Sequence, residues 1–327
     1  SVRLVSNPFG EYLDTENVQT AKQGLARIQQ ILQELNHGKA MRIRFAVGEA
    51  VGAHEIALLP ELIRDYGDLC NACVNVGMDE NGFLDRQTIE LCVAAMQEIG
   101  RITPRGEGNF NFTVNFNCRP LIPYFPAGYH RNAHGSIVVG LETPDLLAAA
   151  LRALDNRPAE QSAFLQTACQ AMHHALQYHA DAVQAVIAAT PLDAGWHYAG
   201  MDTSAAPSKN CTSMAEIYRL LRVPHFGASG SIEASALLTR VFKTLDNVCA
   251  VGFSGLMLAV TEDSGLAAAS RVPTFDLRAL LTYSSVCGIG LDTVPVPGDT
   301  PAAKINAVMA DTAALAFRLN KPLTVRL

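Results

Sequence analysis

Segments with helical and strand-like hydrophobic spacing alternate along this chain, and the alternation limits its possible folds more than any other feature. Residues 16–35 place apolar side chains at helical spacing, and residues 41–47 follow as a predicted strand. The pattern returns as a helix over 56–66, a strand over 69–76 and a helix over 86–100. Such alternation is typical of α/β proteins with a largely parallel sheet, which is the fold class we expect.

The remainder of the chain continues in the same manner. The spacing predicts further strands over 110–116, 136–141, 196–200 and 251–261. It predicts helices over 164–189, 214–222, 231–246, 276–282 and from 300 to about 320. No internal repeat, low-complexity tract or linker interrupts these segments, so we expect one domain over 1–327.

The composition narrows the possible partners. Of the 327 residues, 49% are hydrophobic and 17% charged, and the formal net charge is −6. This mixture argues against disorder, and the absence of a basic excess argues against nucleic acid as a partner. No apolar run reaches the roughly 18 residues of a membrane span, and residues 1–15 lack a signal-peptide pattern. With eight scattered cysteines, we expect a cytoplasmic protein without a membrane partner.

Acidic residues follow several of the predicted strands. Ligands of α/β proteins bind beyond the carboxyl ends of the strands, so acids placed there predict a shared site. Such a site would perform acid–base chemistry or hold a divalent metal ion through oxygen ligands. We assign acid–base roles to Asp202, Glu262 and Asp292, and metal binding to Asp263 and Asp299. The alternative is that each acid caps the next helix or stays in solvent; Glu49 and Glu142 also end strands.

Two polar segments are candidates for binding a ligand. The loop over 224–231 is rich in Gly and Ser and leads into a helix, where backbone N–H groups favour an anion. Residues 109–117 alternate Asn with apolar residues, which would turn amides toward a pocket. A tight turn and a plain half-exposed strand are the alternatives. The predicted ligand-binding residues are Asn111, Asn115, Glu142, Ser204, Phe226, Gly227, Ser229 and Gly230.

Cys287 is the predicted nucleophile. Glycines on its C-terminal side would let a substrate approach the thiol closely. Inert packing is the alternative, because free cysteines are commonly buried.

Several motifs of the chain resemble the DUF711 family, also called UPF0210. They are YFPAGYH at 124–130, GLE at 140–142, YAGMDTSAAP at 198–207, HFGASG at 225–230, GFSGLML at 252–258, LDTVPVPGDT at 291–300 and NKPLTVRL at 320–327. The resemblance implies a single α/β barrel domain like the ten-stranded barrel of pyruvate formate-lyase, with a finger loop at its centre. The glycyl radical motif of those enzymes is not found in this sequence, so the resemblance does not extend to radical chemistry. The family pattern continues past residue 327.

Three functions are compatible with these features. The leading hypothesis is an enzyme acting on a small polar metabolite, for which a carboxylated one is a candidate, with strand-end carboxylates as catalytic groups and a divalent metal ion as the candidate cofactor. The second is a non-catalytic ligand-binding or sensor protein with the same pocket. The third is a structural role as a homo-oligomer, which the low charge and Ala-rich helices allow. A small-molecule ligand and a homo-oligomer are therefore the expected partners.

Overall fold

The structure is a computed structural model that describes residues 2–154, 160–208, 210–286 and 288–327. It divides into two compact units, Ser1–Ala133 with Val296–Leu327 (unit 1) and His134–Pro295 (unit 2). Each unit is described by itself. The single domain over 1–327 stays a prediction.

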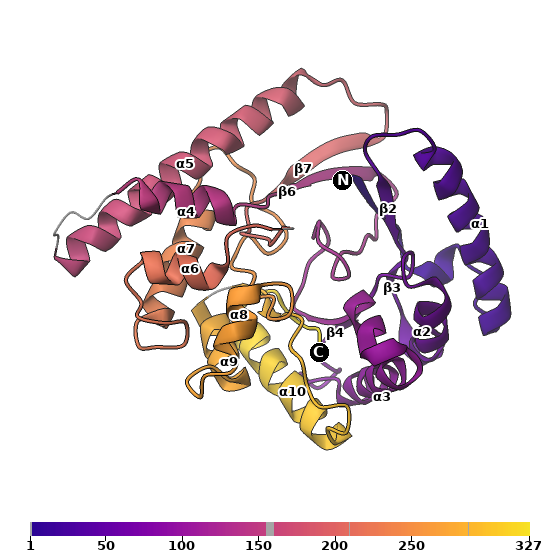
Figure 1. Cartoon of the computed structure of the whole chain (residues 1–327). Helices are drawn as coiled ribbons and strands as arrows, with labels where there is room; N and C mark the ends of the chain where they lie inside the picture. The colour runs from indigo at the N-terminus through magenta and orange to yellow at the C-terminus, as the bar shows by residue number, and fades with distance from the viewer. Residues whose placement is uncertain (1, 155–159, 209, 287) are drawn as a thin grey trace. The chain divides into compact units, whose positions relative to one another are not determined.

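Unit 1 contains four of the helices that the sequence predicts. Its elements are β1 (Val2–Val5), η1 (Phe9–Glu11), α1 (Val18–Asn36), β2 (Ile43–Ala46), β3 (Gly48–Glu49), α2 (Gly52–Tyr66), β4 (Ala72–Val76), α3 (Arg86–Ile102), η2 (Pro104–Asn111), β5 (Phe112–Phe116), α10 (Ala302–Arg318) and β9 (Leu323–Val325). Asn17 caps α1 in a reciprocal capping box with Thr20, and Asp85 caps α3. In Figure 1, α1, α2 and α3 lie on one side of the strands of this unit.

The strands of unit 1 pair mainly in parallel. β1 pairs with β2, and a second sheet runs β3, β4 and β5 in parallel before β9 joins β5 in the antiparallel sense. Val74, Val76, Phe112, Val114 and Phe116 alternate with polar residues and are buried. The alternation predicted for 109–117 is therefore confirmed over β5, with apolar residues on one face and polar residues on the other.

Unit 2 is built from one continuous stretch of chain. It comprises β6 (Gly135–Gly140), α4 (Pro144–Arg152), α5 (Gln161–Ala189), β7 (Trp196–Asp202), α6 (Met214–Leu220), α7 (Ser231–Lys243), α8 (Ser264–Ala269), α9 (Leu277–Val286) and β8 (Gly290–Leu291). β6 and β7 pair in parallel, with a register shift between Ile137 and Val138. Figure 1 shows the long helix α5 beside α4.

One predicted strand is wrong. Within residues 251–261 the structure has one isolated bridge, from Ala259 to Asp292, although the apolar run resembles a buried strand. Gly252 and Ser254 have φ values of 62° and 42°, which interrupt an extended backbone. The backbone N–H groups of Phe253 and Ser254 donate to the side chain of Asp202 instead of to a neighbouring strand.

The α/β class with parallel pairing is confirmed. In the described ranges the strands form open sheets, and no closed barrel is detected. None of the helices described is both long and apolar enough to cross a membrane.

Candidate functional site

A row of polar side chains crosses the sheet of unit 1. Glu49 on β3 is the register partner of Cys73 on β4, and Asn75 on β4 is the partner of Asn115 on β5. Register partners share a face, and so do residues two apart on one strand, so these four side chains lie on one face of the sheet. Thr324 on β9 extends the row, because it pairs with Asn115.

A buried ion pair lies at one end of this row. The carboxylate of Glu49 is only 2% exposed and accepts two hydrogen bonds from the guanidinium of Arg131, Nε to Oε2 at 2.6 Å and Nη2 to Oε1 at 2.5 Å. Asn75 Nδ2 donates to the same Oε1 at 2.7 Å. A buried carboxylate needs such partners, because an unpaired charge in the interior costs several kcal/mol, on the order of 3–5. We call Glu49, Asn75, Asn115 and Arg131 the amide–carboxylate cluster.

Arg131 also faces outward. Its side chain is 53% exposed, and its guanidinium carbon lies 5.6 Å from the centroid of the Tyr129 ring. A guanidinium has five N–H donors, of which Glu49 takes one from Nε and one from Nη2. Among the described contacts, the remaining Nη1–Nη2 edge makes no hydrogen bond. This edge is a planar fork with the geometry that recognises a second carboxylate or a phosphate.

Asn115, on β5, has an unused acceptor. The residue is fully buried, and its Nδ2 donates to Asn75 Oδ1 and to the carbonyl oxygen of Ala127, both at 3.1 Å. Both partners are acceptors, which fixes the orientation of the amide. Asn115 Oδ1 then has no hydrogen-bond partner in the described structure. Leaving a buried acceptor unpaired costs about 1–3 kcal/mol, so a hydrogen-bond donor placed against Asn115 Oδ1 would stabilise the protein.

The thiols beside the cluster are not poised to react. Burial raises the pKa of Cys73 well above its ordinary value, and the nearby negative charge of Glu49 raises it further. Burial also raises the pKa of Cys118. Both sulfurs therefore stay protonated near neutral pH, and the thiolate required of a nucleophile is not formed.

Asp202 occupies the predicted strand end in unit 2, but the protein itself fills its hydrogen-bonding capacity. It is the last residue of β7 and is fully buried. Its Oδ1 accepts from Ser204 N, Ser204 Oγ and Ser254 N at 3.0, 2.6 and 3.0 Å, and its Oδ2 accepts from Phe253 N at 2.8 Å. Burial raises the pKa of Asp202, and these donors oppose the rise. The contacts join the end of β7 to residues 253–254.

Ser204 serves the same local network. Its Oγ donates to Asp202 and accepts from Gly255 N at 3.0 Å. Ser204 is fully buried, and both hydrogen-bond partners of its hydroxyl belong to the protein itself.

Asp263 has the geometry of a helix cap. It is the N-cap of α8, where its Oδ1 accepts from Gly265 N at 2.9 Å and Leu266 N at 3.1 Å. Ser213 Oγ donates to Oδ1, and Met214 N donates to Oδ2 at 2.7 Å. These contacts support the capping alternative. Within the described ranges, no group of three or more His, Cys, Asp or Glu side chains is placed to hold a metal ion. The divalent ion stays a prediction.

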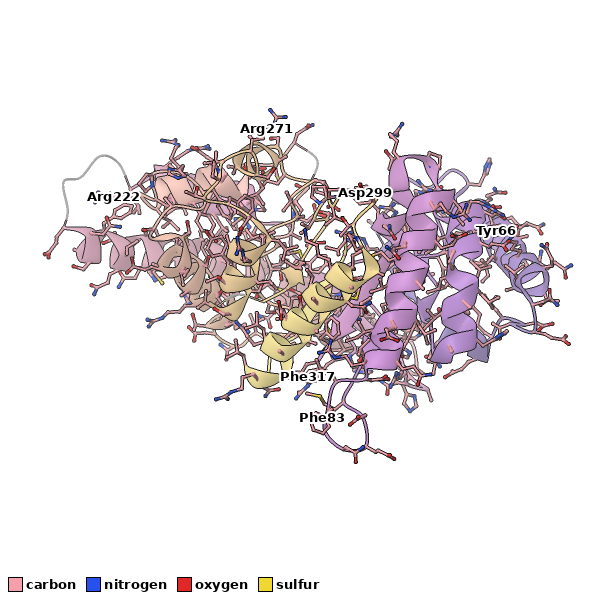
Figure 2. The ribbon with its side chains drawn as sticks, turned by 90° about the horizontal axis from the view of Figure 1, so that it is seen from below. Tyr66, Phe83, Arg222, Arg271, Asp299 and Phe317 are labelled. Carbon is pink, nitrogen blue, oxygen red and sulfur yellow. The ribbon has the colours of Figure 1, made fainter. Side chains whose placement is uncertain are left out.

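The other predicted acids lie apart from the amide–carboxylate cluster in sequence and environment. Asp292 is 9% exposed, and its carbonyl oxygen accepts from Val260 N at 3.2 Å. Glu142 and Glu262 are exposed. Asp299 is exposed in the loop that leads into α10, where Figure 2 labels it.

The predicted anion loop is partly a core element. Phe226 is buried and makes edge-to-face contacts with Tyr218, Phe275 and Tyr283. Gly230, with φ of 99°, is the N-cap of α7 without a side-chain capping bond.

The remaining predicted residues have different settings. Ser229 is exposed, and Gly227 is partly exposed with its N–H donating to Ser231 Oγ at 3.2 Å. Asn111 ends η2, and Cys287 lies outside the described residues.

Sequence reasoning found part of the cluster. Asn115 was expected from its alternation with apolar residues, and Glu49 from its place after a predicted strand. Arg131 and Asn75 were missed. The one local signal for Arg131 is that it directly follows the aromatic motif at 124–130.

A separate cavity of about 380 Å³ opens between α1 and β2. It is lined by Gln29, Leu32, Gln33, Asn36, His37, Arg42, Ile43, Arg44, Phe45, Asp68 and Leu69. None of these residues belongs to the amide–carboxylate cluster or to the predicted site.

Comparison with known proteins gives a consistent result. Residues 1–327 match the family model described as "Uncharacterised ACR (DUF711)". The chain is 28% identical over 275 residues to a UPF0210 protein of Lacticaseibacillus paracasei, covering 82% of this chain and 59% of that protein. It is 31% identical over 226 residues to one of Pyrobaculum arsenaticum, covering 66% and 48%. With a UPF0210 protein of Neisseria meningitidis it shares 27% identity over 280 residues, covering 83% and 60%. The chain thus spans about three fifths or less of these relatives.

Proposed function

The chain belongs to the DUF711 family. We propose that it is an enzyme acting on a small carboxylated metabolite bound at Arg131. The observation that carries the proposal is the half-exposed guanidinium of Arg131, which Glu49 fixes along one edge while the Nη1–Nη2 edge stays open. An arginine held in this way is oriented before a ligand arrives, which lowers the entropy cost of binding.

Glu49 has a positioning role in this proposal. Both of its oxygens accept hydrogen bonds from Arg131, and Oε1 also accepts one from Asn75. A carboxylate engaged in this way orients its partners rather than removing a proton from a substrate. The catalytic roles of Asp292, Glu262 and Cys287 stay predictions, and protein donors already engage the carboxylates of Asp202 and Asp263.

The larger architecture is part of the same proposal. The ten-stranded barrel implied by the family resemblance would place the polar face of the unit 1 sheet toward an enclosed site. Parallel pairing of β3, β4 and β5 supports this arrangement. A homo-oligomer is proposed on the composition alone, and light scattering of the purified protein tests it.

The test measures carboxylate binding and its dependence on Arg131. Small carboxylic acids and the matching carboxamides are screened by thermal shift and by NMR, and bound compounds are then incubated to detect conversion. We expect carboxylates to raise Tm while carboxamides do not, because only the charged group pairs with the guanidinium.

Two matched substitutions complete the test. Arg131→Lys keeps the charge but removes the planar fork, so we expect binding about tenfold weaker or worse. Arg222→Lys is the control, because Arg222 also stacks on an aromatic ring, that of Phe164, but lies outside the cluster. Equal binding by wild type and Arg131→Lys would disprove the assignment. Arg131-dependent binding without conversion would identify a ligand-binding protein instead.

A further inference from the structure

We propose that the cavity between α1 and β2 is a binding site for an organic phosphate monoester, separate from the site at Arg131. Its volume of about 380 Å³ lies within the range of small-molecule sites, roughly 300–1,000 Å³. The walls come entirely from unit 1. No residue of the amide–carboxylate cluster lines the cavity, so this site goes beyond the proposed function and stands independently of it.

The cavity lies at an open edge of β2. In the described sheets β2 pairs with β1 alone. The side chain of Asn36, at the end of α1, occupies part of the other edge: its Oδ1 accepts from Ile43 N at 2.7 Å and its Nδ2 donates to Ile43 O at 2.9 Å. These two hydrogen bonds hold the end of α1 against β2, so the cavity is formed before a ligand arrives.

The position at an edge explains which side chains meet in the cavity. Residues of a strand alternate between its two faces, so Ile43 and Phe45 share one face while Arg42 and Arg44 share the other. All four line the cavity, which therefore reaches around the edge to both faces. Arg42 and Arg44 lie about 7 Å apart along the strand, close enough for both long side chains to contact one ligand.

The charge of the walls favours an anion. Arg42, Arg44 and His37 supply nitrogen donors, whereas Asp68 is the one carboxylate among the lining residues. Within the described part of the chain, neither guanidinium has a carboxylate partner. A phosphate monoester carries up to two charges and three terminal oxygens, which suit two guanidinium groups better than a single carboxylate does.

The apolar part of the wall suits the organic part of such a ligand. Leu32 and Leu69 are buried, and Phe45 is partly buried. The end of α1 carries the partial negative charge of the helix dipole, which disfavours an anion there. The phosphate is therefore placed beside β2, with its carbon skeleton against Leu32 and Phe45. Such a mixed wall is typical of small-molecule sites.

Phenyl phosphate, inorganic phosphate and phenol separate the charged part of the ligand from the apolar part. Dissociation constants are measured by NMR titration of the whole chain at constant ionic strength, with the amides of residues 42–45 as reporters. We expect phenyl phosphate to bind at least about tenfold tighter than either fragment, because only phenyl phosphate contacts both parts of the wall.

Substitutions of opposite charge assign the binding to the cavity. The double variant Arg42→Gln with Arg44→Gln should weaken phenyl phosphate binding about tenfold or more. Asp68→Asn should strengthen it, because the substitution removes a carboxylate that repels the phosphate. Arg27→Gln is the matched control, because Arg27 lies on α1 and bonds Gln30 but does not line the cavity. A gain of affinity in Asp68→Asn does not depend on the double variant folding.

The outcomes are distinct. If phenyl phosphate does not shift the amides of residues 42–45, the inference is wrong. Equal binding of phenyl phosphate and inorganic phosphate would indicate an adventitious ion only and would also overturn it, as would unchanged affinity in the double variant or in Asp68→Asn. Arg131→Lys should leave the binding of phenyl phosphate unchanged. A loss in that variant would assign the binding to Arg131 instead of to the cavity.

Discussion

Gly48 is the first residue of β3 and directly precedes Glu49. Its φ is 82°, and a Cβ at this position would lie 2.6 Å from the carbonyl oxygen of Ser6. Gly48→Ala therefore combines an unfavourable φ with a backbone clash, and we expect it to lower the free energy of unfolding by about 2–4 kcal/mol. Gly52→Ala is the control, because its φ is 80° with no atom within 4 Å. It should cost only about 1 kcal/mol in urea unfolding. Equal losses would show that the contact with Ser6 is unimportant.

Individual site residues could be located from the sequence better than their roles could be assigned. Asp202 does end a strand, as predicted, and Asn115 does face away from its apolar neighbours. Two partners of Asp202, however, are Phe253 and Ser254, which lie 51 and 52 residues further along the chain. A local pattern does not reveal such a partner, so the same carboxylate is compatible with catalysis, metal binding or a structural role.

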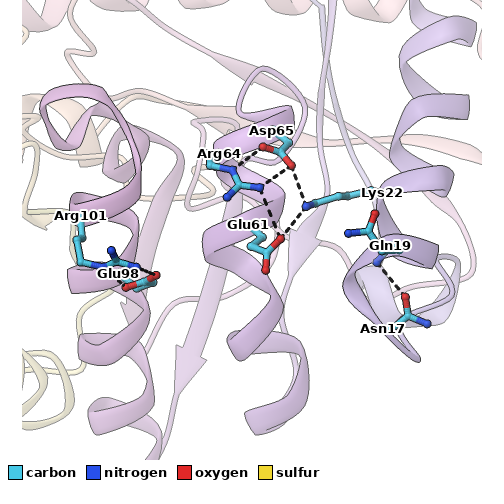
Figure 3. A network of polar contacts seen from close by, with 8 residues as sticks. All are labelled: Asn17, Gln19, Lys22, Glu61, Arg64, Asp65, Glu98 and Arg101. Atoms are coloured by element: carbon cyan, nitrogen blue, oxygen red, sulfur yellow. Dashed lines mark hydrogen bonds and ion pairs between the residues drawn. The ribbon is translucent and has the colours of Figure 1, made fainter.

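An ion-pair network joins two helices of unit 1. Lys22 on α1 contacts Glu61 and Asp65 on α2, at 2.8 Å in each case, and Arg64 also pairs with Asp65 (Figure 3). Arg64 and Lys22 hold the pKa of Asp65 well below its usual range. We expect Lys22→Met to lower the free energy of unfolding by about 1 kcal/mol near neutral pH.

The pH dependence follows from the sign of that shift. A lowered pKa in the folded state means that Asp65 stabilises the protein above its unfolded pKa of about 3.9, and that this contribution is lost as the pH falls. The difference between wild type and Lys22→Met should therefore shrink in urea unfolding below about pH 4. Arg101→Met is the control, because Arg101 pairs with Glu98 within α3 and is 71% exposed. A difference that does not change with pH would contradict the assignment.

Helices were predicted more reliably than strands. The periodic segments predicted α1, α3 and α10 within a few residues. The apolar run at 251–261 misled because a continuous apolar segment has no period that distinguishes a strand from a buried loop. The backbone N–H groups of Phe253 and Ser254 instead donate to the side chain of Asp202, which is a tertiary contact that local spacing does not show.

At the scale of the molecule, the sequence predicted the α/β class but not the division of the chain. Unit 1 combines Ser1–Ala133 with Val296–Leu327, and these segments meet where β9 pairs with β5. The pairing joins Val114 to Val325 in the antiparallel sense, whereas the alternation of elements predicts parallel neighbours. The pairing of β5 with β9 joins residues more than 200 positions apart, and the local spacing of apolar residues does not predict it.

This division predicts how the chain responds to loss of its C-terminal segment. β9 pairs with β5, and Thr113 Oγ1 donates to Val325 O at 3.1 Å. A chain ending at Pro295 lacks β9 and α10, which leaves the backbone of β5 unpaired on that edge. We expect amide hydrogen exchange in β4, β5 and α3 to become markedly faster, while β6, β7 and α5 of unit 2 keep most of their protection. A chain ending at Val325 keeps both elements and should exchange like the whole chain. If β5 stays equally protected after truncation at Pro295, the C-terminal segment is not required to stabilise unit 1.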